Sequence, residues 1–454
     1  MGHAVTYPEH TRAILKLGLP LIGGHLAQIA IGVTDTVMLG WYSVDALAAV
    51  ALGSSLFHVL LIFGSGFAFA VMPMVASFEA EGDETSVRRS TRMGMWLSIA
   101  FALMVMPLFL YSEPILRLMG QPDTVARDAS VYLALAGFGV FPALLVMVLK
   151  SYLAALERTQ IVLWITLLSA VANALVNYVL IFGNWGAPEL GIKGAAIASI
   201  LSQVVMLIGV VIYARLVLPH HALFQRLWRI DPQMLLQVFK LGMPIGLTAL
   251  AETGLFSASA VMMGWLGTVP LAAHGIAVQL AAITFMVHLG LSNVATIRAG
   301  TAYGRHDPEQ MRRGALTVTV MSLVFAAATI ALYLAMPETL LSVFIEQDDP
   351  RRTEILAIGV GLLLMAALFQ LVDGAQVIAL GLLRGVQDTR MPMIYAAVSY
   401  WGVGIPCSYL FGFVWGMEGI GVWLGLVVGL AVAAVTLSTR FWGSSLRKFK
   451  MAHA

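Results

Sequence analysis

Long apolar segments alternate with short charged or Gly/Pro-rich breaks along the whole chain, and this pattern predicts about twelve helices. An α-helix needs roughly 20 apolar residues, each rising 1.5 Å, to cross a bilayer. The segments meet this length, so the pattern is typical of an all-α polytopic membrane protein. The predicted cores are residues 13–39, 48–78, 93–111, 129–155, 161–182 and 192–217, then 236–264, 271–299, 314–336, 354–383, 391–414 and 418–439.

The composition agrees with this pattern and excludes several classes of protein. Of the 454 residues, 59% are hydrophobic and 11% are charged, whereas about 25% are charged in a soluble domain. The single cysteine, Cys407, excludes a disulfide framework and a cysteine-based metal site. No basic run is dense enough for nucleic acid. The N-terminus lacks a cleavable signal pattern, so the first span is expected to remain as a helix.

The lysine and arginine residues indicate the orientation in the membrane. With the N-terminus in the cytoplasm, 21 of the 26 fall on the cytoplasmic side of a twelve-span chain. A wrong number of helices would scramble this bias. We therefore expect a multi-pass protein of the bacterial cell inner membrane, with both termini in the cytoplasm.

The two halves of the chain repeat each other at an offset of 224 residues. Leu15–Pro20 matches Phe239–Pro244, and Val37–Trp41 matches Val261–Trp265 in the same register. Six helices per half mean that both halves enter the membrane from one side, with a cleft expected between two pseudo-symmetric lobes. The expected division is an N-terminal six-helix lobe at 1–218, a cytoplasmic linker at 219–235 and a C-terminal six-helix lobe at 236–454.

Shorter matches extend the repeat, and a polar break separates its halves. Glu157–Thr159 resembles Gln387–Thr389, and Gly191–Gly194 resembles Gly416–Gly419. In the break, the apolar residues Phe224, Leu227, Trp228 and Ile230 predict a short amphipathic helix at the membrane surface. Two adjacent histidines there, His220 and His221, are expected to be solvated rather than ligands.

Three acidic residues lie inside predicted spans, where a charge costs about 2.5–3.5 kcal/mol by insertion scales. Glu252 follows Gly242 by ten residues, so it lies roughly 15 Å deep, near the bilayer midplane. Asp373 is central in its span. Asp35 lies toward the outer end of the first span, where an interfacial carboxylate in water is the alternative. Because desolvation disfavours the charged carboxylate and no intramembrane Lys or Arg is available as a partner, we expect these acids to bind a proton or a sodium ion.

Other polar residues within spans leave two interpretations open. Asn173 and Asn177 are four residues apart and share a helix face, so they make an interhelical hydrogen bond, or they contact an ion or Asp35. Catalytic and phosphate-binding motifs such as HExxH, GxSxG and GxxxxGK[ST] are absent. The glycine-rich pieces GSGFAFA and GIGVWLG indicate close helix packing instead. Candidates for a substrate cleft, each with interhelical packing as the alternative, are Gln28, His274, Gln279 and Gln376.

Three segments resemble the multidrug and toxic compound extrusion (MATE) family, and more narrowly its NorM-like branch. They are TDTVMLG (Thr34–Gly40), PIG…AE (Pro244–Glu252) and VDGAQVIALGLLRGVQDT (Val372–Thr389). The resemblance covers nearly the whole chain, and the third segment is the most specific. It implies a MATE-like fold of two six-helix lobes and a cation-coupled antiporter.

The resemblance also implies particular site residues. It places an ion site at Glu252 and Asp373, where sodium is a candidate, and a polar cluster at Asp35, Asn173 and Asn177. The family's archaeal and DinF-like branches carry an aspartate at the position of Asn177, so the cluster here is less acidic.

We therefore expect an exporter of organic cations and drugs that uses inward H⁺ or Na⁺ flow and alternating access. It is not expected to be an enzyme, to need a cofactor beyond the coupling ion, or to bind nucleic acid, and we expect a monomer in contact with membrane lipid. The main alternative is a lipid-linked oligosaccharide flippase of the same architecture, which should line its cleft with Arg or Lys. A membrane-embedded enzyme would need a nucleophile–base or metal constellation, and a channel would need a continuous pore.

Overall fold

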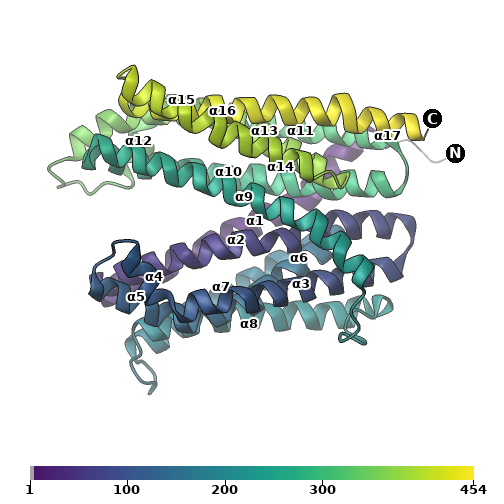
Figure 1. The fold of residues 1–454 in the computed structure, drawn as a ribbon, viewed down its shortest axis with the longest axis horizontal. Coiled ribbons are helices and arrows are strands. Elements are labelled where there is room, and N and C mark those ends of the chain that lie inside the picture. Colours follow the sequence, from purple (N-terminus) through teal and green to yellow (C-terminus); the bar gives the residue numbers. More distant parts are fainter. Residues whose placement is uncertain (1–4, 454) are drawn as a thin grey trace. The chain divides into compact units, whose positions relative to one another are not determined.

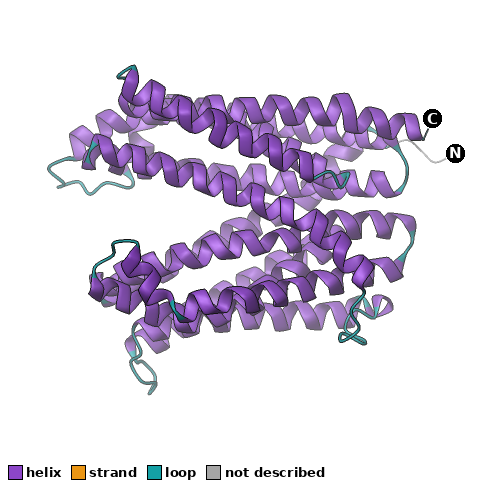
Figure 2. Cartoon of the chain, viewed as in Figure 1, coloured by secondary structure: helices purple, strands orange, loops and turns teal. Residues whose placement is uncertain are grey.

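A computed structural model describes residues 5–453, and these residues form helices and loops without a strand (Figure 2). Twelve helical segments of this described chain are long and apolar enough to cross a membrane, which confirms the predicted number and order of spans. The spans are α1 (Tyr7–Tyr42), α2 (Val44–Glu81), α3 (Glu84–Leu110), α5 with α6 (Asp123–Ala136, Val140–Ala155), α7 (Thr159–Phe182), α8 (Ile192–Val217), α9 (Pro232–Leu266), α10 (Thr268–Gly304), α11 (Pro308–Ala335), α13 (Arg352–Gly385), α14 with α15 (Arg390–Ala397, Ile405–Tyr409) and α16 with α17 (Glu418–Arg440, Leu446–Ala452) (Figure 1).

Shorter elements lie between or within these spans. Two short helices, α4 and α12, follow the third and ninth spans, and the hydrophobic pattern does not predict them. Three π-helical stretches interrupt the last two spans. The bounds are Ser112–Leu118 for α4, Pro337–Ser342 for α12, Gly137–Gly139 and Pro219–His221 for the 3₁₀ turns η1 and η2, and Val398–Gly404, Leu410–Val414 and Phe441–Ser445 for the π-helices η3, η4 and η5.

Two helices, α3 and α11, begin well before their predicted apolar cores because capping residues stabilise their polar first turns. The Asp83 side chain accepts from the backbone N–H of Ser86 at 3.1 Å, so α3 begins nine residues before its predicted core. Asp307 caps α11 in the same way, accepting from Gln310 at 2.9 Å. Gly82 ends α2 in the left-handed conformation that glycine adopts without strain.

The described chain packs as two units. One unit comprises residues 19–246, and the other comprises residues up to Gly18 together with those from Leu247 onward. Thus α1 changes unit two residues before Pro20, and α9 changes unit two residues after Pro244. The expected lobes at 1–218 and 236–454 follow the sequence repeat instead of these packing units, and that division stays a prediction.

Glycines allow backbones to approach closely within the unit of residues 19–246. A Cβ atom at Gly66 of α2 would lie 2.3 Å from the carbonyl oxygen of Gly242 and 2.5 Å from the nitrogen of Gly246. Gly242 and Gly246 of α9 form a GxxxG pattern, which presents a flat face for such packing. Gly66 belongs to the GSGFAFA segment, so the prediction that this segment serves helix packing is confirmed.

Glycines have the same role in the other unit. A Cβ atom at Gly425 of α16 would lie 2.1 Å from the backbone nitrogen of Ser408, and one at Gly421 would lie 2.5 Å from the Phe411 carbonyl. Both glycines belong to GIGVWLG, which therefore also serves packing. On α13, Gly381 and Gly385 lie against α10 in the same manner.

Local geometry is shared between the repeated segments. Glu157 and Gln387, which the repeat matches, both adopt left-handed backbone with φ of +62° and +59°. Gly40 faces Leu47 across a helix junction, with a constructed Cβ 3.6 Å from the leucine side chain, and Gly264 faces Leu271 at 3.9 Å. These pairs occupy matching positions at the offset of 224, so the repeat is one of structure as well as sequence.

The linker between the halves is not the amphipathic helix that the sequence predicts. After the 3₁₀ turn at 219–221, residues 223–228 form consecutive turns, and Ala222 and Arg226 have positive φ. Side chains of α3 take the place of helical N–H donors: Arg92 donates to the carbonyls of Ala222 and Leu223, both at 2.7 Å. Trp96 donates to the Leu227 carbonyl at 2.6 Å. The apolar periodicity was therefore misleading, because these distant donors cannot be read from the linker itself.

His221 is buried, which corrects the expectation that both linker histidines are solvated, whereas His220 is exposed. Tyr152 of α6 hydrogen-bonds to His221 Nδ1 at 2.5 Å, and a carboxylate oxygen of Glu79 lies 3.4 Å from Nε2. Burial lowers the pKa of His221, and this outweighs the opposing effect of the Glu79 carboxylate. The histidine thus fixes the linker to α2 and α6.

Replacing Arg92 with methionine is expected to loosen the linker. The carbonyls of Ala222 and Leu223 would lose their donor, which costs about 1–3 kcal/mol for each buried unsatisfied group. We expect a lower thermal unfolding temperature in detergent and faster chymotrypsin cleavage at Phe224 and Trp228. Arg229→Met, at an exposed linker arginine, is the control. Equal cleavage rates in the two variants would contradict the docking.

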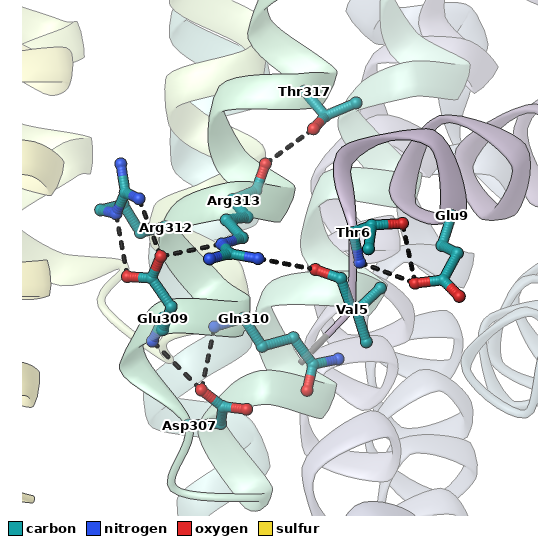
Figure 3. A network of polar contacts seen from close by, with 9 residues as sticks. All are labelled: Val5, Thr6, Glu9, Asp307, Glu309, Gln310, Arg312, Arg313 and Thr317. Carbon is teal, nitrogen blue, oxygen red and sulfur yellow. Dashed lines mark hydrogen bonds and ion pairs between the residues drawn. The ribbon is translucent and has the colours of Figure 1, made fainter. Parts of the chain in front are cut away.

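The residue before the start of α1 is hydrogen-bonded to Arg313 of α11, which also forms an ion pair with Glu309 of its own helix (Figure 3). Arg313 donates to the Val5 carbonyl at 3.2 Å and to Glu309 at 2.8 Å. Thr6 donates its backbone N–H to Glu9 at 2.7 Å, which caps the first turn of α1. These contacts explain why the first turns of α1 pack with residues 247–453.

Candidate functional site

The acidic residues of the second half lie together around one amide. Glu252 is on α9, whereas Asp373 and Gln376 are on α13, one turn apart. The Gln376 amide nitrogen donates to Glu252 Oε1 and to Asp373 Oδ1, both at 3.3 Å. One side chain therefore brings the two carboxylates, which are 121 residues apart in sequence, into a single cluster.

The amide that joins the carboxylates is itself held in place. The Tyr400 hydroxyl donates to Gln376 Oε1 at 2.6 Å, and both side chains are fully buried. Tyr400 lies in the π-helical stretch η3, a form of helix often found at functional sites. The Tyr400 hydroxyl thus fixes the orientation of the Gln376 amide relative to the acids. Because the oxygen is occupied by the tyrosine, only the NH₂ group remains to contact Glu252 and Asp373.

The acids differ in exposure, and a cation lies nearby. Asp373 is 3% exposed, whereas Glu252 is half-buried and keeps accessible surface. The Arg384 guanidinium, in the last turn of α13, interacts electrostatically with Glu252 and with Tyr400. This corrects the expectation that no cation within the spans is available to the acids, because Arg384 belongs to the last turn of the span that carries Asp373. The cluster thus consists of two carboxylates, and the charge of Arg384 acts on Glu252 from the last turn of α13.

Small residues of α13 position Asp373. A Cβ atom at Gly374 would lie 2.8 Å from the ring of His288 on α10, so only glycine lets the two helices approach here. His288 in turn hydrogen-bonds to Ser322 of α11 at 2.8 Å, and Gln370 donates to the Ala281 carbonyl of α10 at 3.3 Å. Asp373 therefore projects from a helix that is fixed on two sides.

The polar residues of the first half also meet. Asn177 of α7 donates to Asp35 of α1 at 2.5 Å and to Asn173 Oδ1 at 3.2 Å. Both asparagines are fully buried, and Asp35 is half-buried. The Asn177 carbonyl oxygen has no hydrogen-bond partner within the described chain. A buried acceptor beside a carboxylate is a donor set suited to a hard cation or to a proton carried by Asp35.

A tyrosine that the sequence pattern does not single out lies near this first-half cluster. Tyr132 of α5 interacts electrostatically with Asp35, and its hydroxyl lies 3.4 Å from the Ser54 hydroxyl of α2. Tyr400 in the second half is likewise not predicted from the sequence, and one reason applies to both tyrosines. Aromatic residues are common in spans, and nothing in their local pattern distinguishes these two.

The four candidates for a substrate cleft have different surroundings. Gln376 joins the acidic cluster, as described above. His274 is buried, with Trp423 donating to Nδ1 at 3.0 Å and the Ser259 hydroxyl 3.5 Å from Nε2, an arrangement typical of packing. Gln28 and Gln279 are exposed. Their part in binding a substrate stays a prediction.

Within residues 5–453, no group of three or more His, Cys, Asp or Glu side chains has the arrangement of a metal site. The second-half cluster consists instead of two carboxylates that share the NH₂ group of Gln376, and carboxylate oxygens can accept a proton.

Comparison with known proteins identifies relatives over nearly the whole chain. The sequence profile of the MatE family matches residues 20–179 and 244–410. A probable multidrug resistance protein NorM of Rhizobium meliloti is 44% identical over 440 residues, covering 96% of this chain and 94% of its own. The NorM protein of Agrobacterium fabrum is 44% identical over 98% of this chain and 96% of its own. A crystal structure of MATE in complex with MaL6 has the same fold, with a TM-score of 0.87, 19% identity and 97% coverage of both chains.

Proposed function

The chain belongs to the multidrug and toxic compound extrusion (MATE) family, and from this premise we propose that it exports organic cations in exchange for H⁺ or Na⁺. The observation that carries the proposal is the amide of Gln376 shared between Glu252 and Asp373. The names of the NorM relatives support multidrug resistance as the physiological outcome. The coupling ion is a substrate in this scheme and not a cofactor.

The carboxylates act as a switch between two cations. When they are empty, their negative charge attracts an organic cation into the protein from the cytoplasm. When the protein opens outward, a proton or sodium ion neutralises them, and the organic cation is released. Exchange requires that the ion bind one conformation more tightly than the other, since a ligand shifts an equilibrium only through differential affinity.

The chain's own residues provide the parts of this switch. Gln376 has one donor for each carboxylate, so ion binding at either acid must rearrange contacts at the other. Tyr400 prevents Gln376 from turning its oxygen toward the acids. Arg384 acts electrostatically on Glu252 and so offsets part of the negative charge of that acid. We place the protein in the bacterial inner membrane as a monomer surrounded by lipid, with both termini in the cytoplasm.

Proteoliposome transport under separately imposed gradients tests this proposal. With purified protein and ethidium as the fluorescent organic cation, we expect a proton gradient, a sodium gradient or both to drive ethidium accumulation above that of protein-free vesicles. A gradient of potassium alone, at equal ionic strength, is the control. If neither a proton nor a sodium gradient moves ethidium, the proposal is wrong.

A further inference from the structure

A small cavity lies where the first turns of α1 meet α10 and α11, inside the packing unit that includes the residues from Leu247 onward. Its volume is about 10 Å³, which is room for one particle close to the size of a water molecule. The polar side chains that line it are His10 of α1, Arg298 of α10 and Gln310 of α11. Of the described residues that line it, none is acidic, and the others are a glycine and apolar residues of α10, α11 and α13.

The contact between Arg298 and His10 determines which histidine nitrogen carries the hydrogen. A guanidinium nitrogen of Arg298 lies 2.8 Å from His10 Nδ1. Because a guanidinium group only donates hydrogen bonds, Nδ1 is the acceptor and the ring hydrogen is on Nε2. The ring also packs against α11, where a Cβ atom at Gly314 would lie 3.6 Å from it. His10 Nε2 is therefore a donor that is held in a fixed position.

Buried donors at this cavity lack an acceptor. Among residues 5–453, His10 Nε2 and Gln310 Nε2 have no hydrogen-bond partner, although His10 is fully buried and Gln310 is only 7% exposed. Arg305 donates to Gln310 Oε1 at 3.5 Å, so the amide oxygen is engaged and the NH₂ group is the part without a partner. A buried donor without an acceptor destabilises the folded protein. Two such side chains at one cavity therefore indicate that an acceptor from outside the chain occupies it.

The carboxylates that act on His10 from outside the cavity are engaged in capping helices. Glu9 accepts from the backbone N–H of Thr6 at 2.7 Å and from its hydroxyl at 2.9 Å. Asp307 accepts from the backbone N–H groups of Glu309 at 3.1 Å and Gln310 at 2.9 Å (Figure 3). Neither carboxylate is among the residues that line the cavity. The two donors are thus left for a ligand.

We propose that the cavity binds a chloride ion, which accepts from His10 Nε2 and Gln310 Nε2 beside the Arg298 guanidinium. A water molecule could also accept from both donors, but it would then need acceptors for its own two hydrogens. An anion has no such need, and its hydrogen bonds to these groups are charge-assisted and stronger than neutral ones. The cavity is too small for phosphate or an organic acid. Bound chloride would connect α1 to α10 and α11, a role that does not depend on the export function proposed above.

Thermal unfolding of the purified protein in detergent tests this proposal. Sodium chloride is compared with sodium gluconate at equal ionic strength, so that screening is the same in both. We expect chloride at saturating concentration to raise the midpoint of unfolding by about 3 °C. His10→Leu is expected to abolish this difference, whereas His220→Leu, at an exposed histidine, should keep it. Gln310→Glu brings a carboxylate to the cavity in place of the anion, so this variant should be equally stable in both salts.

Bromide locates the ion directly, because it replaces chloride and scatters X-rays anomalously. Crystals of the wild-type protein grown in sodium bromide should show an anomalous peak within hydrogen-bond distance of His10 Nε2 and Gln310 Nε2. This measurement and Gln310→Glu decide the matter if His10→Leu does not fold. Equal stability of the wild type in chloride and gluconate would overturn the inference, as would a cavity that holds only water in the bromide crystals. An undiminished chloride effect in Gln310→Glu would place the ion elsewhere and would also refute this site.

Discussion

Ion-driven drug export is expected to fall by about 5- to 150-fold when Glu252 is replaced by glutamine or Asp373 by asparagine, the range of a typical coupling free energy. Both variants keep the size and polarity of the side chain but remove the negative charge that, in the proposed exchange, distinguishes the coupling ion from the organic cation. Gln376 donates to both carboxylates, so the variants are also expected to affect each other. The double variant should therefore lose less than the product of the two single effects.

Ethidium efflux from cells and from proteoliposomes measures this loss, with expression level and thermal unfolding checked for every variant. Glu354→Gln is the matched control, because it removes an exposed carboxylate from the first turn of the helix that carries Asp373. Tyr400→Phe removes only the hydroxyl that holds Gln376, and a smaller decrease is expected. Undiminished efflux in both Glu252→Gln and Asp373→Asn would refute the role of these acids.

The helices could be predicted from the sequence because the hydropathy of each segment by itself indicates a membrane span. Each needs a long apolar segment, and the breaks between segments are polar, so the number and order of spans follow from hydropathy alone. The predicted ends of the helices were less accurate than their number and order. Asp83 and Asp307 extend α3 and α11 through polar turns that the apolar pattern leaves out.

The selected acids and asparagines could be found because a polar group in a span is rare and costly. The contacts that bring these residues together could not be predicted from the sequence. The sequence offers Gln376 as one of four polar candidates and does not distinguish it from the others. Only the packing of α13 on its neighbours places its amide between Glu252 and Asp373. Arg384 lies near a helix end, a position typical of an arginine at the membrane boundary, although its charge acts on Glu252.

The linker shows that a local sequence pattern gives a wrong prediction where hydrogen-bond donors from distant residues determine the backbone conformation. Its apolar spacing fits an amphipathic helix, yet Arg92 and Trp96 satisfy its carbonyls from α3 and stabilise turns instead. His221 was misjudged for a related reason, since its partners Tyr152 and Glu79 lie on two other helices. The partners of His221 lie 69 and 142 positions away in the sequence, and no single segment reveals them.

Substituting Gly66 with alanine is expected to destabilise the packing of α2 on α9 by about 3 kcal/mol, the upper part of the range for overpacking. The new Cβ would lie 2.3 Å from the Gly242 carbonyl oxygen and 2.5 Å from the Gly246 nitrogen. These are backbone atoms, which cannot turn aside as a side chain does. The α9 residues that pack there include Val238 and Ile245, both buried in a shared core cluster, so displacement of α9 would open that cluster.

Thermal unfolding in detergent measures the effect, and Gly275→Ala is the control because a Cβ there meets nothing within 4 Å. Gly242→Ala is expected to destabilise as well, since its Cβ would lie 2.9 Å from the Gly66 carbonyl oxygen. The two substitutions act on one contact, so the second costs little once the first has moved the helices apart. The double variant should therefore be destabilised by less than the sum of the two single variants. Full additivity would mean that each glycine is needed for a separate reason. Gly66→Ala with unchanged stability would show that α2 and α9 do not approach as closely as the backbone positions require.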